Sequence, residues 1–436
     1  MGGADRSCEQ RDGGLTVDGK LMKTRNRAAA VVCGVLCLAV WLVWSGAYRQ
    51  IRGGEEEKLT VGVFSDSYWD VQNGYSYKIV DDAIQIFEER HPDIKVEYVS
   101  GILKDDYSEW LAEQLLSEKG PDVFFILGDD FSSFADAGAL KDLSALIEED
   151  EAFDQSRFYS SAFSSGNYDD GQYALPFECA PKLMFVNRTI LDSEGIDMPE
   201  NGWTWEEFYE ICRSVTKDTD GDGLIDQFGA VGYTWVEAFE SNGVKLFDQN
   251  GTECCLTAPG VEAALSFVER MAALNAGYNV SERDFDLGNA AFQPMLFSEF
   301  RAYQSYPLSV KKYSGFDWGC IPMPAGPEGD NISSLDTLLV GMNDATSETK
   351  YAWEFMKILT YDTEIQSEIF DYSEGVSVLR DVTESEQTLE RLMEDSGSEE
   401  SLNLSILSEA VENSLVEVKF PGYEEAQARV DQAVSQ

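Results

Sequence analysis

Histidine is almost absent from this sequence of 436 residues, which contains only His91. Nucleophilic sites that pair serine or cysteine with histidine need an imidazole as the general base, and many zinc sites need several imidazoles. The sequence therefore nearly excludes both kinds of site. Any enzymatic activity of this chain would have to depend on carboxylates.

Basic side chains are also scarce, because 32 Lys and Arg stand against 80 Asp and Glu, for a formal net charge of −48. A surface of this charge repels the phosphates of nucleic acids and an anionic membrane face. We therefore exclude nucleic acid as a partner. The hydrophobic share of 43% predicts a folded chain, and the length predicts two domains.

Closely spaced cysteine pairs of the CxxC type are missing after residue 58. That part of the chain has an odd number of cysteines, namely Cys179, Cys212, Cys254, Cys255 and Cys320. A disulfide framework or a zinc site needs paired or closely spaced cysteines. We interpret these residues as buried thiols with at most one bridge.

One long apolar run is present, from Ala28 to Tyr48, and it carries no charge. As a helix it would span about 30 Å of hydrocarbon. The basic residues before it favour a cytoplasmic N-terminus and a body outside the cell membrane. We expect an uncleaved anchor and linker over residues 22–58, although a small-residue triplet at 45–47 also fits signal cleavage. Residues 1–21 are interpreted as a disordered tail or a misassigned start.

The segment 218–229, DTDGDGLIDQFG, has the carboxylate spacing of a calcium-binding loop. The expected ligands are the side chains of Asp218, Asp220, Asp222 and Asp226 and the carbonyl of Leu224. The last position of such a loop is normally a bidentate Glu, but here it is Gly229. The segment is either a Ca²⁺ site or an acidic surface turn, since Asp and Gly form turns without a metal. A structural Ca²⁺ is the only cofactor that we expect.

Hydrophobic periodicity predicts an alternation of strands and helices from residue 59 onward. Continuous apolar runs predict buried strands at 59–64 and 121–127, and helical spacing separates them from an alternating strand at 94–98. This β-α-β-α-β order opens a doubly wound sheet, in which ligands bind beyond the carboxyl ends of the strands. Further along, Thr204 and Glu207 form a capping box, which predicts that Trp205 begins a helix and packs within its own lobe.

The order and spacing of several short segments between about Leu59 and Leu379 resemble one known family, the extracellular solute-binding proteins (family 1) of ABC importers, of the maltodextrin-binding type. These segments are FEERHPDIKVEYVSG, GPDVFFI, FADAGALKDL, YALPFE, LMFVNRTIL, GWTWEEF, DTDGDGLIDQFG, FDWGCIPMPAGPEG and AWEFMKILT. The resemblance implies an α/β, two-lobed periplasmic-binding-protein-like fold of class II, with a doubly wound sheet in each lobe, and these lobes would follow the one N-terminal membrane helix expected from the apolar run at 28–48. It also implies that the acidic loop holds a structural calcium in some members, away from the sugar.

The resemblance sets expected lobe boundaries and expected cleft residues. Lobe 1 would comprise residues 59–178 with 319–360, and lobe 2 residues 179–318 with 361–436. The positions that match the family's sugar-binding cleft are Asp66, Trp69, Asp129, Asp130, Phe131, Glu178, Tyr233, Trp235, Arg301, Tyr303 and Asp336. Other interpretations remain for Asp130, which would also serve as a helix N-cap, and for Arg301, which would also form an ion pair between lobes.

The function implied is that of a non-enzymatic binding module, anchored at the cell membrane with its body outside. It would capture an oligosaccharide in an interlobe cleft and deliver it to the permease subunits of an ABC importer. The alternative is a secreted glycoside hydrolase, for which two carboxylates would suffice. A calcium-dependent adhesin is a third hypothesis, which rests on the acidic loop alone. The identity, length and linkage of the sugar are not encoded in these patterns.

Overall fold

The computed structural model describes residues 57–434, apart from 70–74, 76, 129, 249–250, 306–315, 397–403 and 417–419. The expected membrane segment at 28–48 lies outside the described residues. Lys58 to Gln436 form one compact unit, which holds both hydrophobic cores described below. Within the described residues, no helix combines the length and the apolar character that a membrane crossing requires.

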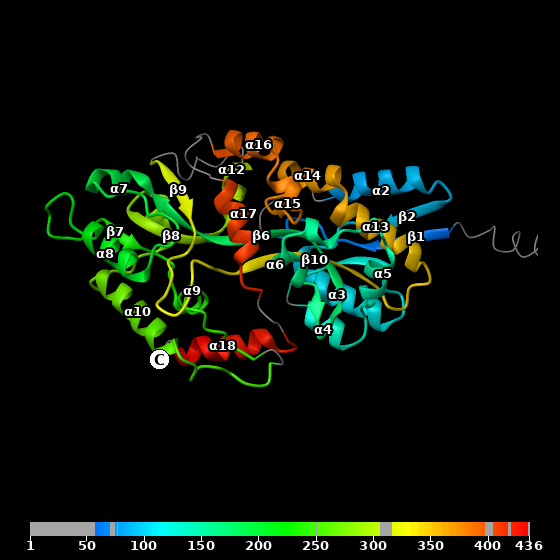
Figure 1. Cartoon of the computed structure of the whole chain (residues 1–436), viewed down its shortest axis with the longest axis horizontal. Helices are drawn as coiled ribbons and strands as arrows, with labels where there is room; N and C mark the ends of the chain where they lie inside the picture. The colour runs from blue at the N-terminus through cyan, green and yellow to red at the C-terminus, as the bar shows by residue number, and fades with distance from the viewer. Residues whose placement is uncertain are drawn as a thin grey trace, which may run out of the picture. The chain divides into compact units, whose positions relative to one another are not determined.

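The described part of the chain is a mixed α/β structure (Figure 1), as predicted. Its strands are β1 (Glu57–Gly62), β2 (Ile94–Tyr98), β3 (Val123–Ile126), β4 (Asn167–Tyr168), β5 (Gly171–Gln172), β6 (Ala174–Asn187), β7 (Phe228–Ala230), β8 (Ala290–Leu296), β9 (Trp318–Ile321), β10 (Leu335–Met342) and β11 (Val376–Ser377). Its helices are α2 (Lys78–Arg90), α3 (Lys104–Leu116), α4 (Phe131–Asp136), α5 (Ser144–Glu149), η1 (Gln155–Arg157), α6 (Ser160–Ser164), α7 (Arg188–Glu194), α8 (Trp205–Val215), α9 (Trp235–Ser241), α10 (Val261–Leu274), α11 (Glu282–Asp286), α12 (Phe297–Ser305), α13 (Thr349–Tyr361), α14 (Thr363–Tyr372), α15 (Arg380–Thr383), α16 (Glu386–Ser396), α17 (Leu404–Asn413) and α18 (Tyr423–Val434).

The main sheet is organised around the long strand β6. The strand order is β2-β1-β3-β10-β6-β8-β7, with β9 and β11 also paired to β6. Residues 174–181 of β6 pair with β10, whereas the residues from Lys182 onward pair with β8 and β9. One half of the strand thus belongs to each half of the sheet.

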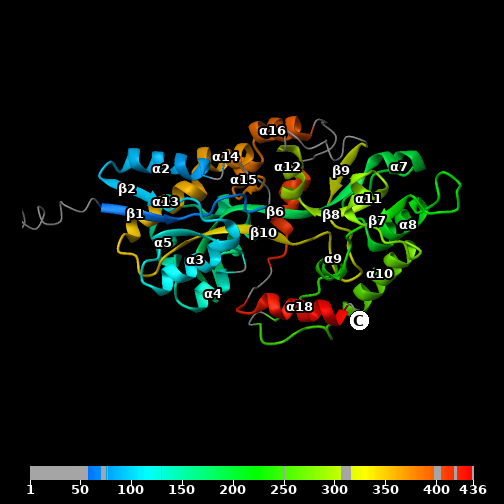
Figure 2. The ribbon, with the colours of Figure 1, turned by 180° about the vertical axis from the view of Figure 1, so that it is seen from behind.

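The sheet is less parallel than the doubly wound pattern predicts. β1 pairs with β3 in parallel, and β7 pairs with β8 in parallel. β10, however, runs antiparallel to both β3 and β6. β6 carries the chain from one half of the sheet into the other, so a returning strand beside it runs in the opposite direction. Figures 1 and 2 show α2 and α14 on one side of the first half, and α3 and α4 on the other.

Two hydrophobic cores flank β6. The larger core contains the strands β1 and β3 and the apolar faces of α2 and α13, with Phe87, Phe124 and Phe355 fully buried. The smaller core lies on the other half of the sheet and includes Phe208 of α8 and Phe292 of β8. The uncharged sequence of β3, VFFI, is buried throughout, which fits a strand covered by helices on both faces.

The C-terminal helices divide between these two cores. Ile365 of α14 and Leu407 of α17 belong to the larger core, which also includes Phe285 and Trp318 from the segment expected in the second lobe. Only further along, at Val430 of α18, does the chain contribute to the smaller core. α14 begins directly after α13, so it packs on the same side of the larger core as α2.

The cysteines form no disulfide among the described residues. Cys179, Cys212 and Cys320 are buried thiols, as predicted, but Cys254 is exposed and Cys255 is partly exposed. These two adjacent residues lie at a short antiparallel bridge between Phe247 and Cys254, outside both cores. Burial was therefore predicted correctly only for the cysteines on sheet strands and on the apolar face of α8.

The predicted capping box at the start of α8 is confirmed. The Thr204 side chain accepts a hydrogen bond from the Glu207 backbone N–H, and the Glu207 carboxylate accepts one from the Thr204 N–H. This cap fixes the direction in which Trp205 enters the smaller core. The Trp205 ring stacks on Phe267 with centroids 4.5 Å apart, and its Nε1 donates to Ser241 Oγ at 3.2 Å.

Removing this indole should destabilise the protein without affecting the pocket described below. We expect Trp205→Ala to lower the free energy of unfolding by about 3–5 kcal/mol, because it leaves a large cavity in a packed core. Leu116→Ala is the matched control, since Leu116 is 87% exposed, and it should change stability by no more than about 0.5 kcal/mol. Urea denaturation of residues 57–436 measures both values; equal effects would contradict the packing assigned to Trp205.

Candidate functional site

A pocket opens beside the carboxyl ends of β1 and β3 and the first half of β6. The space there is about 510 Å³ when the open solvent at its mouth is counted. Its described lining residues are Val63, Phe64, Asp66, Ser67, Tyr68, Tyr75, Ile79, Val80, Phe125, Phe177, Glu178, Leu338, Tyr372 and Ser373. The position agrees with the rule that open α/β sheets bind ligands beyond the carboxyl ends of their strands. Two of the predicted site residues, Asp66 and Glu178, lie on its wall.

The loop after β1 holds the pocket together by contacts to distant parts of the chain. Asp66 adopts a left-handed backbone conformation with φ of 73°, which is unusual for a residue other than glycine. Ser67 Oγ donates to the Glu374 carboxylate at 2.8 Å, and the Tyr68 hydroxyl donates to Asp336 Oδ1 at 2.8 Å. Such strained loops are often found at binding sites, where the surrounding contacts maintain them.

Glu178 is the most deeply placed carboxylate of the site, at 3% exposed. Burial raises its pKa to about 7, and the charge of Glu374 adds to this rise. Ser373 Oγ donates to Glu178 Oε2, which partly offsets the effect. The Trp69 indole lies close enough to lower this pKa as well, although its Nε1 makes no hydrogen bond of normal geometry with any described residue.

A buried arginine completes the cluster behind the pocket. Arg301 of α12 donates from Nη1 to the Gly375 carbonyl at 2.6 Å and from Nη2 to the Phe370 carbonyl at 2.8 Å. Burial raises the pKa of Glu374, while Ser67 and the charge of Arg301 lower it. Gly375 permits this close packing, because a Cβ there would lie 2.3 Å from Glu178 Oε2. Residues 373–375, which precede β11, therefore pack directly against the Glu178 carboxylate on β6.

The structure thus brings five of the predicted residues to one region, namely Asp66, Trp69, Glu178, Arg301 and Asp336. Sequence patterns did not identify Ser67, Tyr68, Tyr75, Tyr372, Ser373 and Glu374, which line or support the same pocket. The last three lie at the end of α14 or directly after it, and they reach the site only because α14 packs on the larger core. A Ser-Glu-Gly triplet between a helix and a short strand is too common to indicate a site.

The predicted residues after β3 have other partners. Asp130 precedes α4 at the N-cap position, yet its side chain makes no cap and accepts instead from Ser108 Oγ at 2.5 Å. Phe131 is buried in the larger core. Asp129 lies outside the described residues, as does the side chain of Tyr303.

The predicted aromatic residues of the second half lie in the smaller core. Tyr233 and Trp235 are each 9% exposed, and Tyr233 packs edge-on against Phe208. Trp235 Nε1 donates to Asp431 Oδ1 at 2.9 Å, so the C-terminal helix α18 covers this indole. The resemblance implies a position in the cleft for both residues.

A buried ion pair lies beside Trp235 where β6 passes from one half of the sheet to the other. Lys182 Nζ lies 2.8 Å from Glu237 Oε1 of α9. Burial alone would lower the pKa of Lys182, but Glu237 and Glu240 outweigh it and hold the lysine charged. Glu237 also caps α9 through Thr234, so the pair ties β6 to the start of that helix.

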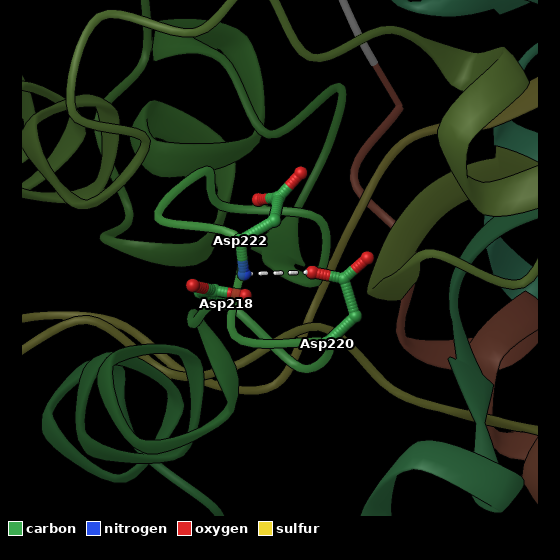
Figure 3. Close-up of side chains that lie close together, drawn as sticks. All are labelled: Asp218, Asp220 and Asp222. Atoms are coloured by element: carbon green, nitrogen blue, oxygen red, sulfur yellow. Dashed lines mark hydrogen bonds between the residues drawn. The ribbon is translucent and has the colours of Figure 1, made fainter.

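The acidic loop gathers three of its four expected carboxylates (Figure 3). Oxygen atoms of Asp218, Asp220 and Asp222 lie within 4.8 Å of one another. Asp218 accepts from the backbone N–H groups of Gly221 and Gly223, and these bonds lower its pKa. A set of carboxylate oxygens suits a hard cation such as Ca²⁺.

The fourth expected carboxylate has a different partner. Asp226 accepts from the Thr219 backbone N–H and hydroxyl, both at 2.8 Å, and does not join the other three. Leu224 donates its N–H to Asp222 Oδ1 at 2.8 Å. Asp226 and Leu224 are the two later ligands of the calcium pattern. Both take part in hydrogen bonds within the turn itself.

Comparison with known proteins identifies the family. The family of bacterial extracellular solute-binding proteins matches residues 68–363, which is more than half of the chain. The chain belongs to this family. The match confirms the resemblance drawn from the sequence segments, and it extends from the loop after β1 to the beginning of α14.

Two relatives of known name are similar in sequence to this solute-binding protein. It is 23% identical over 282 residues to a maltotriose-binding protein of Pyrococcus abyssi, which covers 63% of this chain and 57% of that one. It is 28% identical over 168 residues to the diacetylchitobiose binding protein DasA of Streptomyces coelicolor, covering 38% of each. The chain thus spans less than two thirds of the length of either relative.

A solved structure agrees over most of the chain. The cyclic alpha-maltosyl-1,6-maltose binding protein from Arthrobacter globiformis superposes with a TM-score of 0.70 at 15% identity, covering 87% of this chain and 93% of that one. At this identity the agreement establishes a shared fold and nothing finer. The mixed α/β prediction is thereby confirmed.

The raised pKa of Glu178 predicts a specific pH dependence of stability. The folded state keeps Glu178 protonated up to about pH 7, whereas the unfolded carboxyl ionises near its ordinary value of 4.5. The folded state thus binds more protons in between, so stability falls as pH rises through this window, by at most about 1.4 kcal/mol per pH unit. Glu178→Gln should remove this part of the slope in urea titrations.

The control for this pH series is Glu194→Gln. Glu194 has a lowered pKa, because Lys217 donates to it, so in the upper part of the window it is ionised in both states and adds no slope there. This variant should keep the slope of the unsubstituted protein. An identical slope in the Glu178→Gln variant would show that the buried carboxyl is ionised in the folded protein.

Proposed function

We propose that this chain captures an oligosaccharide outside the cytoplasm and delivers it to the permease subunits of an ABC importer. The observation that carries this proposal is the pocket whose walls combine tyrosine rings with the carboxylates of Asp66 and Glu178. Aromatic faces stack on the C–H surface of a sugar ring, and carboxylates accept hydrogen bonds from its hydroxyls. Membership of the solute-binding family supports the same conclusion.

The names of similar proteins support a saccharide as the ligand class. The relatives bind maltotriose and diacetylchitobiose, and the structural neighbour binds a cyclic maltosyl-maltose. These sugars differ in ring substituents and linkage, so they support the class and leave the individual sugar open. We extend only the class to this chain.

A ligand bound by both halves of the fold would drive closure around it. The half that contains β1 and β3 would contribute Asp66, Trp69 and Glu178, and the other half would contribute side chains other than Tyr233 and Trp235, which are buried in the smaller core. A sugar that binds the closed form better than the open form shifts the population toward closure. Because β6 runs through both halves and residues 322–334 lead from β9 back to β10, we propose that these two connections form the hinge of a class II, two-lobed binding protein.

Delivery to an importer requires the body to remain near the membrane. We propose that residues 22–58 act as the anchor and linker, with the body on the outer side. The solute-binding family is extracellular, which supports this location. The basic residues before the apolar run at 28–48 favour the same orientation.

Saccharide binding is testable with residues 57–436. Maltotriose and N,N′-diacetylchitobiose should each be titrated by calorimetry and by indole fluorescence, and at least one should bind. Asp66→Asn should weaken that binding by about 1.5–3 kcal/mol, the range for a hydrogen bond to a charged group. Asp169→Asn is the matched control, because Asp169 also has a positive φ, of 49°, but lies in the turn between β4 and β5.

The hydrolase alternative predicts that the titrated sugar is cleaved in the same samples. A binding protein leaves the titrated sugar intact over hours, and reducing-end analysis measures this directly. Steady product formation that Glu178→Gln abolishes would establish a hydrolase instead. Equal loss of binding in the Asp66 and Asp169 variants would place the sugar outside this pocket.

We also propose that the acidic loop binds a structural Ca²⁺. The three clustered carboxylates of Asp218, Asp220 and Asp222 support this, since they provide hard oxygen donors on one exposed turn. The ion would stabilise the turn between α8 and β7 rather than contact a ligand. The bonds of Asp226 to Thr219 leave further ligands to backbone carbonyls and water.

Melting curves with calcium and with EGTA test this site. Calcium at 100 times its dissociation constant should stabilise the folded protein by about 2.7 kcal/mol, because the unfolded chain lacks the site. Asp220→Asn combined with Asp222→Asn should abolish the difference, whereas Asp226→Asn should keep it. If millimolar calcium leaves the melting temperature unchanged, the segment is an acidic turn without a calcium site.

A further inference from the structure

The charged groups on the pocket wall all have one sign. Among the described lining residues, Asp66 and Glu178 are acidic and none is basic, and Glu374 stands directly behind Ser67. The basic side chains nearby have partners of their own: Arg301 donates to two backbone carbonyls, Lys104 donates to the Tyr68 carbonyl at 2.6 Å, and Lys78 pairs with Asp82. An anionic sugar would therefore meet like charge on this wall.

The tyrosines of the pocket add a second attraction for positive charge. Tyr68, Tyr75 and Tyr372 line it, and the rings of Tyr75 and Tyr372 lie 5.2 Å apart. Two of these rings already attract cations at the rim, since Lys104 Nζ lies 5.3 Å from the Tyr68 centroid and Lys78 Nζ lies 5.2 Å from that of Tyr372. The face of an aromatic ring favours a cation through its quadrupole.

We propose that this pocket takes the ammonium group of an amino sugar, held by Asp66 and Glu178 and enclosed by the three tyrosine rings. The inference rests on the proposed function and specifies its substrate class. The sugar ring itself would stack in the same pocket, and its charged substituent would distinguish it from a neutral saccharide.

Desolvation gives the physical reason for this preference. Burial raises the pKa of Glu178 to about 7 although the charge of Arg301 lowers it, so an ionised carboxylate at this position is costly without a further cation. A neutral hydroxyl makes one hydrogen bond and leaves Glu178 protonated. An ammonium group donates a hydrogen bond to the Glu178 carboxylate and neutralises its charge. Binding of the ammonium group therefore favours the ionised form of Glu178. The groups facing this carboxyl are Trp69, Arg301, Ser373 and Glu374.

The test compares two disaccharides that differ only at nitrogen. Chitobiose carries free amines, whereas N,N′-diacetylchitobiose carries neutral amides, and both should be titrated calorimetrically into residues 57–436 at about pH 6.5. Chitobiose should bind at least about tenfold more tightly. Lowering the pH to about 5 should weaken chitobiose binding as Glu178 becomes protonated, with little effect on the diacetyl form.

Glu178→Gln should reduce the preference for chitobiose to less than about threefold. Asp66→Asn should also reduce the preference for chitobiose. This variant tests the proposal if Glu178→Gln does not fold. The matched control is Glu368→Gln, because Glu368 has a pKa of about 7 for the same primary reason, burial, but does not line the pocket. This variant should keep the full preference.

The outcomes separate this inference from the proposed function. Equal or tighter binding of the diacetyl form, or of maltotriose, would overturn the amino-sugar inference while supporting saccharide binding. Loss of preference in Glu368→Gln as well would overturn the role given to the pocket carboxylates. Binding of none of the three saccharides would overturn the proposed function and this inference together.

Discussion

The structure depends on one continuous strand that belongs to both halves of the sheet. All of β6 is buried except Lys182, which is partly exposed at the point where its pairing passes from β10 to β8 and β9. Any movement of one half against the other must bend this strand or its partner β10, whose register already shifts between Leu338 and Leu339. Glu178 lies on β6 four residues before Lys182, so the proposed ligand site and the proposed hinge share one element.

The same region concentrates the buried ionisable groups of the larger core. Glu178, Glu374 and Arg301 are each at most 6% exposed, although burial of a charge is costly in the absence of partners. Hydroxyl groups and backbone carbonyls satisfy part of this requirement, but they do not remove the rise in the pKa of Glu178. An apolar cluster of similar size would stabilise the fold at least as well. We therefore attribute the polar cluster to binding rather than to stability.

Local patterns predicted the elements, and they failed where tertiary contacts decide. The period of α2, the buried run of β3 and the cap at Thr204 are properties of neighbouring residues, so the sequence indicates them directly. Glu374 enters the site only through the packing of α14. Trp235 is covered by Asp431, which lies 196 positions away, and nothing near the tryptophan in the sequence indicates this contact.

The strong acidity of the chain and the acidic wall of the pocket act over different distances. Charges on the surface are screened within about 10 Å at moderate ionic strength, so the net charge of −48 mainly affects the approach of a ligand. Inside the pocket, screening is weaker because little water separates the carboxylates from a bound group. Under the proposed assignment, Asp66 and Glu178 would therefore select between a cationic, a neutral and an anionic sugar. Added salt should slow the association of a cationic sugar far more than it changes which sugar remains bound.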